Sequence, residues 1–173
     1  MTSSRKQKYA LNVEGRNQMS LALEKILTPL PGHPTRPAAE EIDEKLNIAV
    51  VFTSVEATLA ALRRAGALAH QLAARITLLV PQIVPYPLAL ESPPVLLDWN
   101  EHRFRVLANQ MPVETTVRLY LCRDDVETLR NALRPKSVVV IGSRKRRWPF
   151  TREKRLTRQL RRAGHEVIFT ETE

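Results

Sequence analysis

Apolar and polar positions follow two alternating patterns between residues 46 and 170. Short, mostly apolar runs have the length and composition of buried strands, and they cover residues 47–52, 75–81, 113–122, 137–141 and 166–170. Longer segments with helical spacing lie between them, at about residues 54–74, 95–109, 124–133 and 151–163. Because strands that alternate with helices pair in parallel through right-handed crossovers, the pattern predicts an α/β fold with a doubly wound parallel sheet and helices on both faces.

Capping residues mark the boundaries of these helices. Thr53 and Glu56 form a capping box, in which the Thr53 side chain is expected to cap the open amides of the first helix. Asp124 begins a second motif of the same kind. Thr151 is expected to cap the last helix and Gly164 to end it, since glycine readily adopts the left-handed conformation found there.

Residues 1–45 have a different character and predict an N-terminal arm ahead of a domain at residues 46–173. Apolar side chains three or four apart in residues 17–27 predict a short amphipathic helix. Four prolines between Pro29 and Pro37 predict an extended, semi-rigid linker, because proline interrupts both helices and central strands. Three alternatives stay open for the arm: it docks on its own domain, binds a protein partner, or stays unattached.

Charge is concentrated in one part of the chain. The 173 residues include 27 Lys and Arg and 18 Asp and Glu, for a formal net charge of +9. Ten of the basic residues and a single acid, Glu153, lie between Arg144 and Arg162, and the rest of the chain is balanced. We therefore expect this segment to bind an anion, which could be a phosphorylated ligand, a nucleic acid or an acidic membrane surface.

The sequence predicts neither membrane insertion nor export. No apolar run reaches 18 residues, so we expect no transmembrane segment, and the N-terminus lacks the apolar centre of a secretory signal. Cys122 is the sole cysteine, which excludes an intramolecular disulfide and favours a reducing, cytoplasmic location. We expect Cys122 itself to be a small buried hydrophobe.

Catalytic and metal-binding patterns are also missing from the sequence. The four histidines are scattered and no pair has the spacing of metal ligands; they are His33, His70, His102 and His165. No nucleophile, base and orienting group form a recognisable set, so we expect a protein that is not an enzyme.

Four stretches resemble the universal stress protein family. They are NIAVVFTSVE, ITLLVPQIVPYP, YLCRDDVETL, and VVVIGSRKR together with QLRRAGHEVIF, and the likeness covers about residues 46–170. The resemblance implies a five-stranded parallel sheet in the order 3-2-1-4-5, and a homodimer formed through the last strand. It also implies a ligand crevice at the carboxyl ends of strands one and four, since the strand order reverses there.

The chain departs from this family where the family binds ATP. Members that bind ATP end strand one with an aspartate, and this chain has Phe52 there. The family's loop has three spaced glycines that let backbone amides approach phosphates. Here Gly142 keeps the first position, while Lys145 and Arg155 occupy the other two. The resemblance therefore implies an ATP site that is lost or heavily altered, and no cofactor is assigned beyond a candidate nucleotide.

These considerations lead to one functional prediction and one alternative. We expect a non-catalytic, stress-related or regulatory protein that binds a nucleotide or another phosphorylated or anionic ligand at the basic loop. The predicted contacts are Thr53, Ser54, Gly142, Ser143, Arg144, Lys145, Arg147, Thr151 and Arg152. In the alternative, the arm and the last helix bind a protein complex, an acidic membrane surface or RNA, through Arg155, Arg158, Arg161 and Arg162. An ATP hydrolase and a basic surface without a specific ligand are the remaining interpretations.

Overall fold

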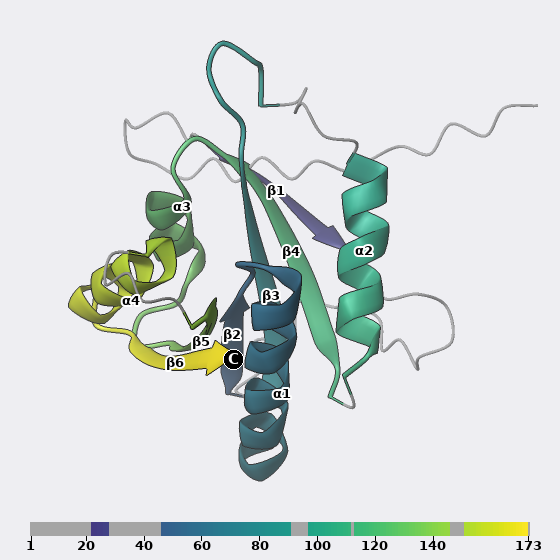
Figure 1. Ribbon diagram of the computed structural model, residues 1–173, viewed down its shortest axis with the longest axis vertical. Coiled ribbons are helices and arrows are strands. Elements are labelled where there is room, and N and C mark those ends of the chain that lie inside the picture. Colours follow the sequence, from purple (N-terminus) through teal and green to yellow (C-terminus); the bar gives the residue numbers. More distant parts are fainter. Residues whose placement is uncertain (1–21, 28–45, 91–96, 112, 146–150, 173) are drawn as a thin grey trace, which may run out of the picture.

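The protein is an α/β domain with one mixed sheet (Figure 1). The computed structural model describes residues 22–27, 46–90, 97–111, 113–145 and 151–172. The strands are β1 (Ala22–Leu27), β2 (Asn47–Val51), β3 (Arg75–Ile83), β4 (Thr115–Cys122), β5 (Val138–Arg144) and β6 (Glu166–Thr172). The helices are α1 (Val55–Leu72), α2 (Leu97–Asn109), α3 (Asp125–Ala132) and α4 (Arg152–Arg162).

The parallel part of the sheet has the predicted strand order. The full order is β1-β4-β3-β2-β5-β6, and the five strands from β2 to β6 pair in parallel. Numbered among themselves along the chain, these five strands stand in the order 3-2-1-4-5. The order reverses between β2 and β5, so the carboxyl ends of these two strands flank the topological switch point.

β1 corrects the prediction for the arm and the strand count. The expected helix over residues 17–27 is wrong where the structure describes it, because Ala22–Leu27 is a strand that pairs antiparallel with β4. Leu27 is buried, and the Glu24 carboxylate accepts a hydrogen bond of 3.0 Å from the Tyr120 hydroxyl. The open edge of β4 thus overrides a helical spacing that spans only a few residues. The sheet has six strands instead of five, and the proline-rich linker lies outside the described residues.

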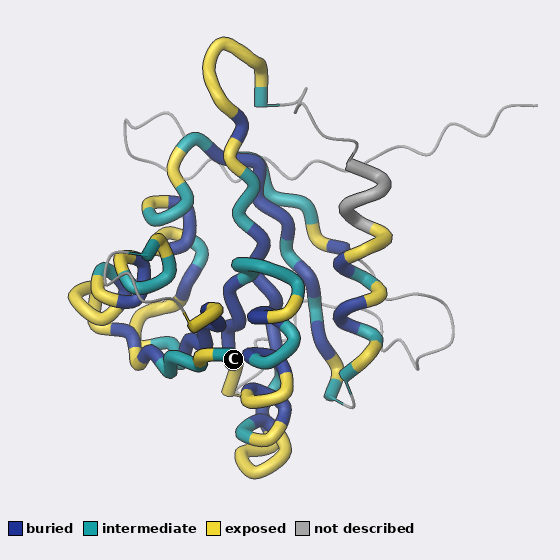
Figure 2. Tube along the Cα trace, in the orientation of Figure 1, coloured by how far each residue is buried: buried dark blue, intermediate teal, exposed yellow. Residues whose placement is uncertain are grey.

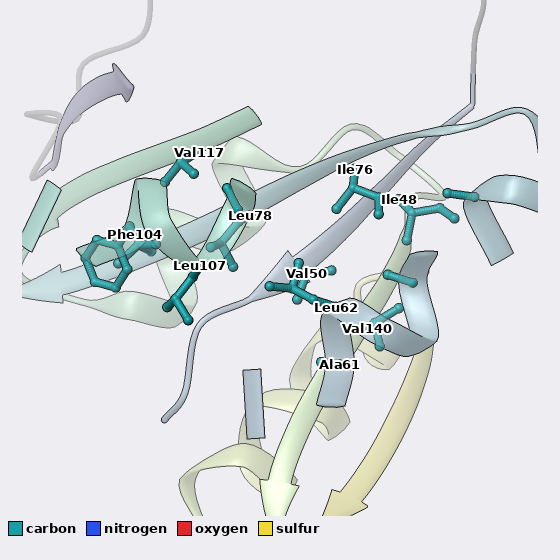
Figure 3. Close-up of a cluster of buried hydrophobic side chains, with 14 of the residues drawn as sticks. Ile48, Val50, Ala61, Leu62, Ile76, Leu78, Phe104, Leu107, Val117 and Val140 are labelled. Carbon is teal, nitrogen blue, oxygen red and sulfur yellow. The ribbon is translucent and has the colours of Figure 1, made fainter. Parts of the chain in front are cut away.

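Two apolar clusters cover the two faces of the sheet. α1 and α2 pack on one face, where Leu62 lies among side chains of the central strands such as Val50 and Val140 (Figure 3). α3 and α4 pack on the other face, through Leu129 and Leu160 among others. The central strands are buried while the outer surface of α4 is largely exposed (Figure 2). The helices therefore lie on both faces, as predicted.

None of the helices that the structure describes is both long enough and apolar enough to span a bilayer.

Candidate anion-binding site

The predicted crevice lies where β2 ends and β5 continues. β2 ends at Val51, which pairs with Ile141, and the chain then turns into α1. The Thr53 hydroxyl donates a hydrogen bond of 2.8 Å to the carbonyl oxygen of Gly142. The Thr53 amide donates to the hydroxyl of Thr58, at 3.1 Å. Polar groups on the two sides of the switch point are therefore bonded to each other.

Ser54 caps α1 in place of Thr53. The Ser54 hydroxyl oxygen accepts a hydrogen bond from the amide of Ala57, at 3.4 Å, and Ser54 has extended backbone angles typical of an N-cap. The prediction that Thr53 is the cap is wrong by one residue, because its hydroxyl is engaged by Gly142. Both residues lie at the switch point, and their hydroxyl groups already have protein partners.

Gly142 has a packing role that the sequence does not reveal. It lies inside β5, and a Cβ atom added there would be 1.9 Å from the carbonyl oxygen of Ala57. This distance is far below any van der Waals contact, so only glycine lets β5 approach the first turn of α1. Close backbone packing thus accounts for the glycine without a bound phosphate.

The segment that follows Gly142 is strand instead of loop. Ser143 is buried and Arg144 pairs with Thr172 of β6. The amide of Lys145 donates to the carbonyl oxygen of Thr172, at 2.8 Å. β5 and β6 are both longer than predicted, and residues 146–150 of the predicted basic loop lie outside the described residues.

The cations beside the crevice point to acids of different helices. Arg144 forms an ion pair with Glu56 in the first turn of α1. Arg152 donates from its Nε atom to Oδ2 of Asp125 in α3, at 2.7 Å. Since α1 and α3 cover opposite faces of the sheet, Arg144 and Arg152 do not converge on one point.

The remaining predicted residues have separate positions. Thr151 caps α4 as predicted, by accepting a hydrogen bond of 3.3 Å from the amide of Lys154. Lys145 is exposed at the end of β5. Arg147 lies outside the described residues. Phe52 packs edge-on against Phe104 with ring centroids 4.9 Å apart. Binding by the nine predicted residues stays a prediction.

A groove lies between α4 and β6. It has a volume of about 580 Å³ and is lined by Lys154, Thr157, Arg158, Arg161, Phe169 and Glu171. Three of its lining residues are cationic, and they stand four and three residues apart, on one side of the helix. None of the residues that line this groove is among the nine predicted contacts. The basic sequence of α4 supported only the alternative function.

An ion pair and a hydrogen bond place two of these cations along the outer strand. Lys154 Nζ lies 3.7 Å from Glu171 Oε1, at the carboxyl end of β6. Arg161 donates from Nη2 to the carbonyl oxygen of Val167, at 2.9 Å, near the start of β6. Thr157 is 95% buried in the groove wall, and its hydroxyl has no hydrogen-bond partner among the described residues. The groove therefore contains polar groups that the described chain does not fully satisfy.

Cys122 and the potential metal ligands are the remaining candidate groups. Cys122 is buried, and burial raises the pKa of its thiol, which keeps it protonated. The described residues contain no cluster of three or more His, Cys, Asp and Glu side chains suited to a metal ion.

Comparison with known proteins finds a likeness in structure and none in sequence. A scan against protein-family models finds no match, and a search of curated proteins finds none either. Among solved structures, this chain is similar to a protein from the universal stress protein family from Burkholderia pseudomallei, with 21% identity and a TM-score of 0.49. The alignment covers 71% of this chain and 93% of that chain. At this identity the likeness concerns the fold alone.

Proposed function

We propose that this protein is a non-catalytic binding protein that recognises an anionic partner through the outer surface of α4. One observation carries the proposal: four of the five arginines of α4 are exposed and have no acidic partner among the described residues, whereas Arg144 and Arg152 beside the crevice each have one. The four are Arg155, Arg158, Arg161 and Arg162. Unpaired cations retain their full charge for an anionic partner, while paired ones must first release a carboxylate.

A nucleotide in the crevice is the competing function. It would have to displace the bond between Thr53 and Gly142, or use Arg144 while Glu56 holds that side chain. Exposed Lys145 is the feature that favours this candidate, since it has no acidic partner among the described residues. For either function we propose a stress-related or regulatory role, on the basis of the sequence resemblance.

Binding measurements on two multiple variants separate the two functions. One variant changes Arg155, Arg158, Arg161 and Arg162 to glutamine, and the other changes Arg144, Lys145 and Arg152 to glutamine. The probes are fluorescently labelled poly-glutamate, a labelled single-stranded oligonucleotide and labelled ATP, each measured by anisotropy at low and moderate salt. Circular dichroism of every variant verifies that it is folded.

We expect the α4 variant to lose at least about tenfold in affinity for a polyanion, and the crevice variant to retain it. The polyanion affinity should also fall steeply with salt, because released counterions supply much of the binding free energy. Tight ATP binding that only the crevice variant loses would overturn the proposal. The absence of polyanion binding by the unmodified protein at low salt would equally count against it.

A further inference from the structure

The outer edge of β6 has unpaired backbone groups. The amide of Glu166 donates to the carbonyl oxygen of Ser137, at 3.0 Å, and the carbonyl oxygen of Thr172 accepts from Lys145 at the other end. Successive residues of a strand direct their amide and carbonyl groups to opposite sides. Val167, Phe169 and Glu171 therefore direct theirs away from β5, and no described strand pairs with them.

A row of cations runs beside this edge. Lys154 lies at Glu171 and Arg161 at Val167, and Arg158 stands between them on the same side of α4. α4 is thus antiparallel to β6, and its cations follow the residues with outward-facing backbone groups. The row has a spacing of about 5–6 Å, because it follows i, i+4 and i+7 on a helix.

We propose that an acidic, extended segment of a partner protein binds here by adding a strand to the outer edge of β6. This inference rests on the proposed function and names the partner's chemistry. Alternate side chains of a strand lie on one face about 7 Å apart. Acidic residues at every second position would therefore face the row of Lys154, Arg158 and Arg161, while backbone hydrogen bonds supply the rest of the contact.

The opposite edge of the sheet already has an added strand of this kind. β1 adds to β4 as an antiparallel strand, and its acidic residue Glu24 reaches two groups of β4 on one face. The Glu24 carboxylate accepts hydrogen bonds from the Tyr120 hydroxyl and from Arg118, at 3.0 and 3.4 Å. An added strand with an acid over a cation is thus part of this fold, and β6 presents the same elements without the strand.

Arg161 protects the edge while it is empty. Its guanidinium donates to the outward-facing carbonyl oxygen of Val167, which would otherwise invite pairing with any exposed strand. An acidic side chain of the partner would attract Arg161 and free this carbonyl. A neutral strand lacks that attraction, so the arrangement selects for acidic segments.

Charge also argues against a second copy of this chain as the occupant. α4 has six basic residues and one acid, Glu153. Pairing two β6 edges would place two such helices on the same face of a continuous sheet, where like charges repel. The homodimer that the sequence resemblance implies stays a prediction, and it becomes an outcome of the test below.

The test uses the full chain and a labelled ten-residue peptide with glutamate at every second position and threonine or valine between. Its first control has the same composition with the glutamates contiguous. The next two controls carry N-methyl groups on the glutamates alone or on the intervening residues alone. In strand addition only one of these two sets faces β6, so N-methylation of that set should abolish binding and the other should be tolerated.

We expect the alternating peptide to bind at least about tenfold more tightly than the contiguous one. Arg158→Gln should weaken its binding about tenfold, because Arg158 lines the groove. Arg63→Gln is the matched control, since this exposed arginine belongs to α1 on the other face of the sheet and does not line the groove. It should change the affinity less than about twofold.

Other outcomes overturn the inference in distinguishable ways. Equal affinities for all four peptides would show charge attraction without strand addition, which leaves the proposed function standing. A peptide that binds but depends on Arg144 instead of α4 would remove the proposed function as well. If the alternating peptide does not bind, no acidic strand adds to β6 and the inference is wrong. If sedimentation shows a dimer that excludes the peptide, the edge binds a second copy of this chain instead.

Discussion

The crevice between β2 and β5 and the groove between α4 and β6 differ in how their polar groups are satisfied. In the crevice, the Thr53 hydroxyl bonds to Gly142, Ser54 caps α1 and Arg144 pairs with Glu56. In the groove, the hydroxyl of Thr157 is buried without a partner among the described residues. The groove is also lined by exposed arginines, while glycine in the crevice closes the space between strand and helix.

This difference shows why the place of a motif is weak evidence for its use. The crevice has the topology of a ligand site, but its residues already stabilise the fold. The groove has no recognisable motif, yet a partner there would contact Arg158, which has no acidic partner among the described residues, and would displace the bond from Arg161 to Val167. Interactions that are already made oppose binding, and unmade ones favour it. Four predictions test this contrast, beginning with the largest expected effect.

Gly142→Ala is expected to lose about 3 kcal/mol or more of the free energy of unfolding. The new methyl group would lie 1.9 Å from the Ala57 carbonyl oxygen, so β5 and α1 must separate. Gly66→Ala is the matched control, because nothing lies within 4 Å of a Cβ at that helical position. It should gain up to about 1 kcal/mol from helix propensity. Urea unfolding followed by circular dichroism measures both.

A small effect of Gly142→Ala on stability, together with a loss of ligand binding, would reverse the comparison. Gly142 would then serve a bound phosphate instead of the packing of α1. The crevice would become the functional site, and the groove would lose its priority.

Leu27→Ala is expected to cost about 2–3 kcal/mol, because Leu27 is buried in the cluster beneath α1 and α2. Ile26→Ala is its control, since this neighbour in β1 is 58% exposed and should change stability by less than about 0.5 kcal/mol. Thermal unfolding of the two variants shows whether β1 fills its edge in solution. Equal effects would remove β1 as a precedent for a strand added at β6.

The sequence was sufficient to predict the parallel sheet. Continuous apolar runs such as residues 47–52 identify strands buried on both faces, and the helices between them predict parallel pairing. The strand order was predicted from the resemblance to a known family. It was insufficient for β1, because six residues with apolar side chains at Leu23, Ile26 and Leu27 satisfy a helical spacing as well as a strand. The open edge of β4 decided between them, and that edge exists only once the sheet has formed.

The site was less accessible to sequence reasoning for a similar reason. Charge and topology correctly placed Thr53 and Gly142 together, but not the hydrogen bond that joins them across 89 positions. The pairing of Arg144 with Glu56 likewise depends on contacts between distant segments. The row of cations on α4 was visible as composition, whereas its alignment with β6 follows from the packing of the helix on the sheet.

The same substitution in the two regions should have opposite effects. Thr53→Val removes the hydrogen bond to the Gly142 carbonyl oxygen and should cost about 1 kcal/mol. Thr157→Val removes a buried hydroxyl without a described partner, so stability should stay unchanged or rise by up to about 1 kcal/mol. Urea unfolding of the two single variants checks the pair. A clear loss for Thr157→Val would show that its hydroxyl is satisfied, which would weaken the contrast between groove and crevice.

The smallest expected effect is a dependence on pH that arises beside α4. Burial lowers the pKa of His165, and the charge of Arg130 lowers it further. The folded state therefore favours neutral His165, whose contribution is present above the unfolded pKa of about 6.5 and is lost as the pH falls through the lower folded value. Urea unfolding at pH 7.5 and 5.5 should show a drop that His165→Gln reduces. An equal drop in that variant would place the titrating group elsewhere, and burial and Arg130 would then have no measurable effect on stability through His165.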